Sequence, residues 1–68
     1  MRLERLAKDQ NSGDKGCPSF WDDLDSTDFV VLGTAVDTAG MENVLPGEAA
    51  IRIKREIVFE AMRRYGGR

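Results

Sequence analysis

Apolar side chains follow two different periods along this chain. Residues 29–36 form a nearly continuous apolar run, and residues 49–53 alternate between apolar and polar side chains. Both patterns are typical of β-strands, the first of a strand that is covered on both faces. From Lys54 onward the spacing changes to the period of about 3.6 residues that a helix requires. The apolar stripe of this predicted helix comprises Ile57, Val58, Ala61, Met62 and Tyr65.

Turn-forming residues separate these segments and set their order. The acidic stretch 22–28 is a predicted turn that joins a short strand at residues 19–21 to the apolar run in a hairpin. Residues 37–48, which include Pro46 and Gly47, are a predicted loop with one helical turn at residues 41–44. We expect Gly66 to end the helix in a left-handed conformation. The predicted fold is α+β, a small antiparallel sheet followed by one C-terminal helix, in the order β-β-β-α.

The start of the chain has a different composition. Residues 8–16 contain no apolar side chain, and a segment that buries nothing does not offset the entropy lost on ordering it. Leu3, Leu6 and Ala7 have the spacing of one or two helical turns, which are marginal in water on their own. We therefore expect a flexible, disordered N-terminal segment at residues 1–16 and a single small α+β domain at residues 17–68.

The strand predicted at residues 29–36 is apolar on both faces. One face holds Phe29, Val31 and Ala35, and the other holds Val30, Leu32 and Val36. A single helix covers only one face of a sheet, so the second face needs another cover. The candidates are the N-terminal segment, the 37–48 loop through Met41, Val44 and Leu45, or a second copy of the chain. We expect the second copy, and hence a homodimer; a monomer with the loop as a lid is the alternative.

Two further residues of these strands allow alternative interpretations. Phe20 and Trp21 are adjacent, so one faces the core and the other faces away. An exposed Trp21 would be a hot spot for protein contact, whereas a Trp21 at the core edge would be structural. Gly33 interrupts the apolar run, and we favour a kink that curls the sheet over a bulge or a close backbone approach.

Charge is distributed unevenly along the 68 residues, although the formal net charge is only −2. Residues 14–48 hold one Lys against eight Asp and Glu, and residues 49–68 hold six Lys and Arg against two Glu. We expect the basic end to pair with acidic loops of the same chain or of a second copy. The alternative is nucleic-acid binding. It would use Arg52, Lys54, Arg55, Arg63, Arg64 and Arg68.

The residue types that carry most chemistry are scarce. The chain has no His and one Cys, so the commonest general base and an internal disulfide are both excluded. We expect Cys17 to be a free thiol or to bridge two chains. An EF-hand loop that starts at Asp23 would need Gly and Glu where Asp28 and Thr34 stand. The sequence predicts no enzyme activity, cofactor, metal site, membrane span or secretory signal, and hence a cytoplasmic protein.

Three motifs together resemble a known family. They are Cys-Pro-Ser-Phe-Trp at residues 17–21, Asp-Phe-Val-Val-Leu-Gly at residues 28–33 and Ile-Arg-Ile-Lys-Arg-Glu-Ile at residues 51–57. Over residues 17–58 the chain resembles small actinobacterial regulatory proteins of the BldB-like group, with Lys54 where that group has a proline. The resemblance implies a small dimeric regulator, often encoded beside helix-turn-helix transcription regulators, with no catalytic residues.

The predicted function is therefore that of a small regulatory module that binds proteins, with itself and another protein as partners. A nucleic-acid-binding accessory protein is the alternative. The candidate contact residues are Trp21, Val30, Leu32, Val36, Arg52, Arg55, Arg63 and Arg64.

Overall fold

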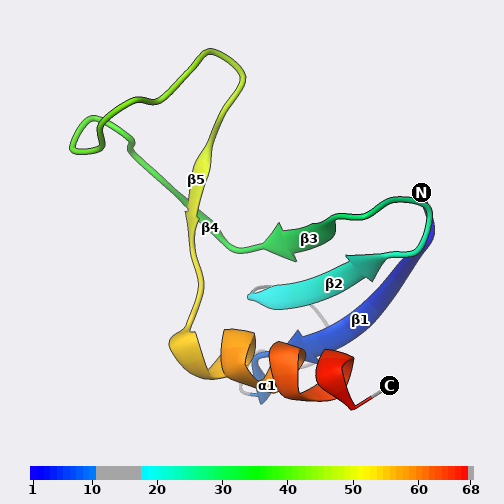
Figure 1. The fold of residues 1–68 in the computed structure, drawn as a ribbon. Helices are drawn as coiled ribbons and strands as arrows, with labels where there is room; N and C mark the ends of the chain where they lie inside the picture. Colours follow the sequence, from blue (N-terminus) through cyan, green and yellow to red (C-terminus); the bar gives the residue numbers. More distant parts are fainter. Residues whose placement is uncertain (11–17, 68) are drawn as a thin grey trace.

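A computed structural model describes residues 1–10 and 18–67 and confirms the α+β class. Figure 1 shows the three-stranded sheet, the helix beside it and two further strands that extend away from both. The elements are β1 (Leu3–Lys8), β2 (Ser19–Asp23), β3 (Phe29–Leu32), β4 (Thr34–Val36), β5 (Ala50–Arg52) and α1 (Arg55–Gly66). One antiparallel sheet has the order β1-β2-β3, and β4 pairs with β5 in a second sheet.

The hairpin expected around the acidic stretch is present as β2 and β3. Phe20 lies opposite Val31, and Trp21 lies opposite Val30. Because side chains alternate along a strand, Phe20 and Val31 share one face of the sheet and Trp21 and Val30 share the other. The prediction that the adjacent aromatic residues point in opposite directions is confirmed, with Phe20 in the core.

The expectation of frayed helical turns near the N-terminus is wrong, because Leu3–Lys8 is the strand β1. Its register with β2 shifts between Arg5 and Ala7, so Leu6 is an extra residue in the ladder. Leu6 and Ala7 are only 2% and 4% exposed. Pairing with β2 and burial of Leu6 and Ala7 stabilise this segment as a strand, whereas a short isolated helix does not recover the cost of its first turn. The rest of the predicted flexible segment, residues 11–16, and Cys17 lie outside the described residues.

The helix α1 packs against β1 and β2 and forms the core with them. Ile57 and Ala61, one turn apart, are buried against Leu6, Ala7 and Phe20. At the other end of the helix, Phe29 links the sheet to α1, because its ring lies 5.2 Å from that of Phe20 and 5.0 Å from that of Tyr65. The whole core therefore lies on one side of the three-stranded sheet.

The capping residues at the two ends of α1 agree only in part with the sequence prediction. Lys54 stands at the N-cap, but its side chain makes no capping hydrogen bond to the helix, and Glu56 supplies the favourable negative charge in the first turn. Gly66 does not adopt the left-handed conformation that we expected, since it lies within the helix. The cap is Gly67 at φ −86°, whose backbone N–H donates to the carbonyl oxygen of Arg63 at 3.2 Å.

The apolar run does not continue as one strand, because it changes sheets at Gly33. A Cβ atom at this position would overlap the carbonyl oxygen of Arg52 and lie 3.1 Å from Cδ1 of Ile51. Close backbone approach, the less favoured of our two interpretations, therefore explains this glycine. Beyond it, β4 pairs with β5 while β3 stays with β2.

The segment from β4 to β5, residues 34–52, is called the arm below. Its loop contains no helical turn at residues 41–44, which differs from our expectation. Instead, the backbone N–H of Met41 donates to the carbonyl oxygen of Thr38, and that of Glu48 donates to Leu45. Gly47 at φ +88° follows Pro46, and a type II turn favours Pro followed by Gly at its two central positions. Local turns thus hold the loop in shape while it extends away from the helix (Figure 1).

Gly33→Ala is expected to destabilise the protein by about 1–3 kcal/mol, because the new methyl group meets backbone rather than a movable side chain. Gly40→Ala is the matched control, since nothing lies within 4 Å of that position. Thermal unfolding followed by circular dichroism gives the comparison. Equal melting temperatures for the two variants would contradict the role of Gly33.

Candidate protein-binding surface

The side of the sheet opposite α1 includes three apolar residues from β2 and β3. Leu3 and Arg5 of β1 lie on the same side, because they pair with Asp23 and Trp21. Trp21 and Val30 lie opposite one another in the ladder, and Leu32 follows Val30 by two residues on the same face. Leu32 is 51% exposed, whereas Trp21 and Val30 are half-buried. We call these three residues the helix-free face. It brings together three of the residues that the sequence singled out for contact.

The polar atom of Trp21 is bonded within its own strand. Its Nε1–H donates to Oγ of Ser19 at 2.9 Å, and Ser19 is buried. This bond satisfies the indole donor without a partner protein, so the ring offers its apolar surface to a contact. Trp is among the residue types enriched at the hot spots of protein interfaces.

Neither intramolecular cover that we considered lies over this face among the described residues. The N-terminal segment pairs edge to edge as β1 and buries Leu6 and Ala7 under α1, while Leu3 is 37% exposed. The loop belongs to the arm, where Met41 and Leu45 are 55% and 64% exposed rather than packed on β3. A second copy of the chain stays a prediction.

Val36 is separated from the other apolar candidates. It lies in β4 opposite Ala50 and is half-buried there. The change of sheets at Gly33 removes it from the surface that Val30 and Leu32 share. Alternation along residues 29–36 had placed all three on one face, which holds only for an unbroken strand.

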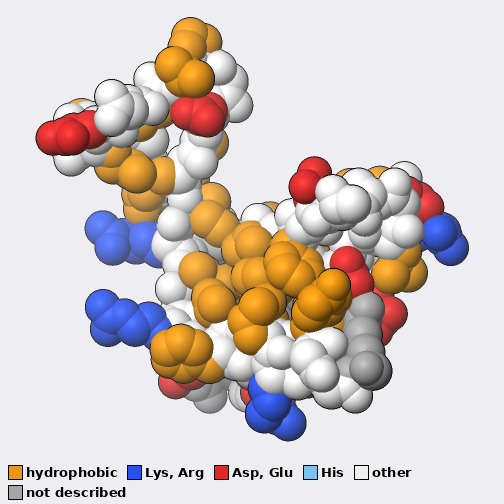
Figure 2. Space-filling model, in the orientation of Figure 1, with side chains coloured by type: hydrophobic (Ala, Val, Ile, Leu, Met, Phe, Trp, Pro, Cys, Tyr) orange, Lys and Arg blue, Asp and Glu red, His pale blue; other side chains and the backbone are white. Residues whose placement is uncertain are grey.

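The basic candidates are spread over several elements. Arg52 lies in β5 and Arg55 starts α1, and both are exposed. Arg63 pairs with Glu60 at 3.3 Å. The Nη1 group of Arg64 donates to the carbonyl oxygen of Leu6 at 2.9 Å, which ties the end of α1 to β1. In Figure 2 the Lys and Arg side chains stand in separate groups around the molecule.

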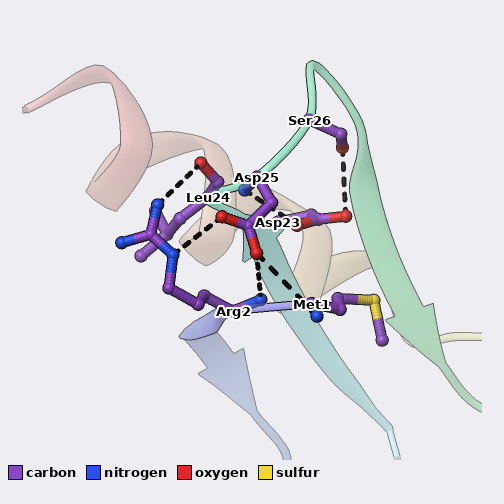
Figure 3. A network of polar contacts seen from close by, with 6 residues as sticks. All are labelled: Met1, Arg2, Asp23, Leu24, Asp25 and Ser26. Carbon is purple, nitrogen blue, oxygen red and sulfur yellow. Dashed lines mark hydrogen bonds and ion pairs between the residues drawn. The ribbon is translucent and has the colours of Figure 1, made fainter.

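The acidic turn between β2 and β3 binds its own backbone and the N-terminus. Asp23 accepts hydrogen bonds from the backbone N–H of Asp25 and from Oγ of Ser26 (Figure 3). Asp25 accepts from the backbone N–H and Nε of Arg2, at 2.9 Å and 2.7 Å. These bonds anchor β1 to the hairpin. Across residues 1–10 and 18–67, no group of three or more acidic or thiol side chains is arranged to hold a metal ion.

An ion pair that the sequence did not predict joins the end of β1 to the start of α1. Nζ of Lys54 lies 2.6 Å from Oδ2 of Asp9, linking the residue after β1 to the residue before α1. Asp9 is buried, although it falls in the polar stretch that we expected to be flexible. The hydrogen bond with Asp9 raises the pKa of Lys54 above its ordinary value of 10.5.

Phe59 is an exposed residue that the sequence analysis did not single out. It is 69% exposed in the middle of α1. Arg55 and Arg63 lie four residues before and after it and therefore share its side of the helix. The signal was present in the sequence, since Phe59 is the aromatic residue that falls outside the apolar stripe of the helix.

Comparison of the chain with protein-family models, with curated proteins and with solved structures finds no match. In the described part of the chain, no helix combines the length and the hydropathy needed to cross a membrane.

Lys54→Met is expected to lower the melting temperature at neutral pH, because Asp9 then loses its nearby ammonium group. The raised pKa means that this stabilisation is complete below a pH of about 10.5 and is lost as the pH rises through the folded-state value. The difference in melting temperature between Lys54→Met and the wild type should therefore become smaller in strongly alkaline solution. Lys8→Met is the control; an equal effect of both substitutions, or a difference that does not change with pH, would contradict the assignment.

Proposed function

We propose that the chain is a non-enzymatic protein–protein interaction module, that it works as a homodimer, and that the helix-free face binds another protein. The regulatory setting rests on the resemblance to the BldB-like group. One observation carries the proposal, namely that Trp21, Val30 and Leu32 form an apolar face without a helix over it.

The helix-free face combines the exposed Leu32 with two half-buried apolar neighbours, Trp21 and Val30. Isolated apolar residues are normal on protein surfaces, whereas neighbouring ones that include an aromatic ring mark contact sites. The three residues are neighbours across the β2–β3 ladder. β3 is also an end strand of its sheet, since it pairs with β2 alone among the described strands. Its sequence, Phe-Val-Val-Leu, lacks the charges and prolines that protect edge strands from pairing.

Total surface area supports the homodimer. The chain has an accessible surface of 5429 Å². Folded monomers of its mass of 7.6 kDa expose about 4,300 Å² on average. The excess is about 1,100 Å², which exceeds the roughly 800 Å² that each partner buries in a standard interface.

Nucleic-acid binding is less well supported by the positions of the basic side chains. A phosphate-binding surface needs several Lys and Arg side chains that converge and are available for contact. Lys54 pairs with Asp9, Arg63 pairs with Glu60, and Arg64 donates to a backbone carbonyl. Arg52 and Arg55 are the exposed bases that remain from the predicted set, and Arg68 lies outside the described residues.

The lack of histidine in the sequence disfavours acid–base catalysis.

A homodimer of this chain has a mass of about 15 kDa, twice the 7.6 kDa of one chain. Size-exclusion chromatography with light scattering at micromolar concentration should give this value for the untagged protein. A mass of 7.6 kDa across the accessible concentration range would contradict the dimer.

Leu32→Lys is expected to abolish capture of the partner protein, because it places a charge at the exposed end of the helix-free face. Leu24→Lys is the matched control, since Leu24 is 43% exposed and lies in the β2–β3 turn. Tagged chains expressed in the native cell would be compared by quantitative mass spectrometry. Recovery of the same proteins by all three chains would contradict the proposed face. Salt-sensitive binding to duplex DNA or RNA would support the alternative instead.

A further inference from the structure

The arm contains a hollow that no described part of the chain fills. Its volume is about 420 Å³, within the range of protein binding sites, and it opens to solvent. The lining includes the apolar residues Met41, Val44, Ala49 and Ala50 and the acidic residues Glu42 and Glu48. We call it the arm hollow. A lining with both apolar side chains and two carboxylates suits an apolar ring that is flanked by positive charge.

The arm is acidic, and its carboxylates form no ion pair among the described residues. Residues 34–51 include Asp37, Glu42 and Glu48 and contain no Lys or Arg. Asp37 accepts a hydrogen bond from the backbone N–H of Ala39, and Glu48 accepts one from that of Leu45. The ion pairs in residues 1–10 and 18–67 instead involve Asp9, Asp25 and Glu60.

The outer side of α1 has the complementary chemistry. Arg55, Phe59 and Arg63 follow one another at four-residue intervals and are all exposed. We call them the helix stripe. Within the described residues, the ion pair of Arg63 is the exposed one with Glu60, and Arg55 forms no ion pair. An aromatic side chain between two guanidinium groups is the counterpart of an apolar hollow with two carboxylates.

These two surfaces do not meet within one chain. Figure 1 shows the arm extending away from α1, and Figure 2 shows acidic side chains near the end of the arm, apart from the Lys and Arg side chains beside the helix. The radius of gyration is 13.1 Å. A chain of this length packed as a compact domain would have about 11 Å. Because the arm extends away from α1, its hollow lies apart from the helix stripe of the same chain (Figure 1).

We propose that the arm hollow receives Phe59 of a second copy of the chain, with Arg55 and Arg63 of that copy near Glu42 and Glu48. A two-fold axis makes the exchange reciprocal, so that each dimer contains two such contacts. The inference rests on the homodimer of the proposed function and names the surfaces that form it. The helix-free face then stays available to another protein.

Charge reversal tests this arrangement. Glu42→Lys reverses a carboxylate of the arm hollow that has no hydrogen bond in the loop. Arg55→Glu reverses a charge of the helix stripe and places it favourably at the start of a helix. Each substitution occurs twice in a two-fold dimer, so each should raise the dimer dissociation constant at least about tenfold in low salt. Analytical ultracentrifugation measures the constants.

Mixing the two variants gives the sharper result. A heterodimer of the Glu42→Lys chain with the Arg55→Glu chain restores opposite charges at one contact and keeps the original pair at the other. The mixture should therefore form heterodimers more tightly than either variant forms homodimers. Asp28→Lys makes the same charge change as Glu42→Lys in the β2–β3 turn and should leave the dimer constant unchanged.

Phe59→Ala provides a second variant that does not depend on charge. The side chain is exposed, so its removal should weaken the dimer at least about tenfold while the melting temperature of the monomer stays the same. A wild-type dimer that tolerates Phe59→Ala, Glu42→Lys and Arg55→Glu would overturn the arm contact and leave the homodimer standing. A monomeric wild type would overturn both.

Discussion

The fold depends on the contact of α1 with β1 and β2. It buries Leu6, Ala7, Phe20, Ile57 and Ala61, and two of these five side chains are alanines. A domain of this length has a core near the lower limit for independent stability. Polar contacts at the margin of this core reinforce it, since Arg64 bonds the backbone of β1 and Lys54 pairs with Asp9. All of these groups lie on or around one face of one sheet.

Because one helix covers one face, the remaining apolar side chains lie outside the core. Gly33 permits this division, since the absence of a side chain leaves room for the backbone of Arg52 where the chain passes from the first sheet into the arm. Leu32 stays on the helix-free face, while Met41 and Leu45 are carried to the exposed loop. Because one helix covers only one face of the sheet, the chain has both an uncovered apolar face and an arm that lies outside the core.

The elements that the sequence predicted correctly are those with a local pattern. The β2–β3 hairpin, β5 and α1 follow from alternation, from turn residues and from a helical stripe, each within a few neighbouring positions. β1 was not predicted because its stability comes from pairing with β2 and from burial of Leu6 under α1. Gly33 was misinterpreted for the same reason, since Arg52 lies far away in the sequence.

The sequence correctly predicted which candidate contact residues share a face where the strand continues without a break and its side chains alternate. Trp21, Val30 and Leu32 share a face as expected, whereas Val36 lies beyond the break. Phe59 was not predicted as a contact residue because it lies outside the apolar stripe that identified the buried side of α1. The arm hollow has no signal in the sequence at all, because turns at Thr38, Pro46 and Gly47 create it in three dimensions.

The central claim is that the helix stripe of a second copy of the chain covers the arm hollow. Nuclear Overhauser effects between isotopically labelled and unlabelled chains in one sample measure contacts between copies and exclude those within a chain. Contacts of the Phe59 ring with the methyl groups of Met41 and Val44 of the other copy are expected. Intermolecular contacts confined to other residues, or none in a sample at high concentration, would contradict the claim.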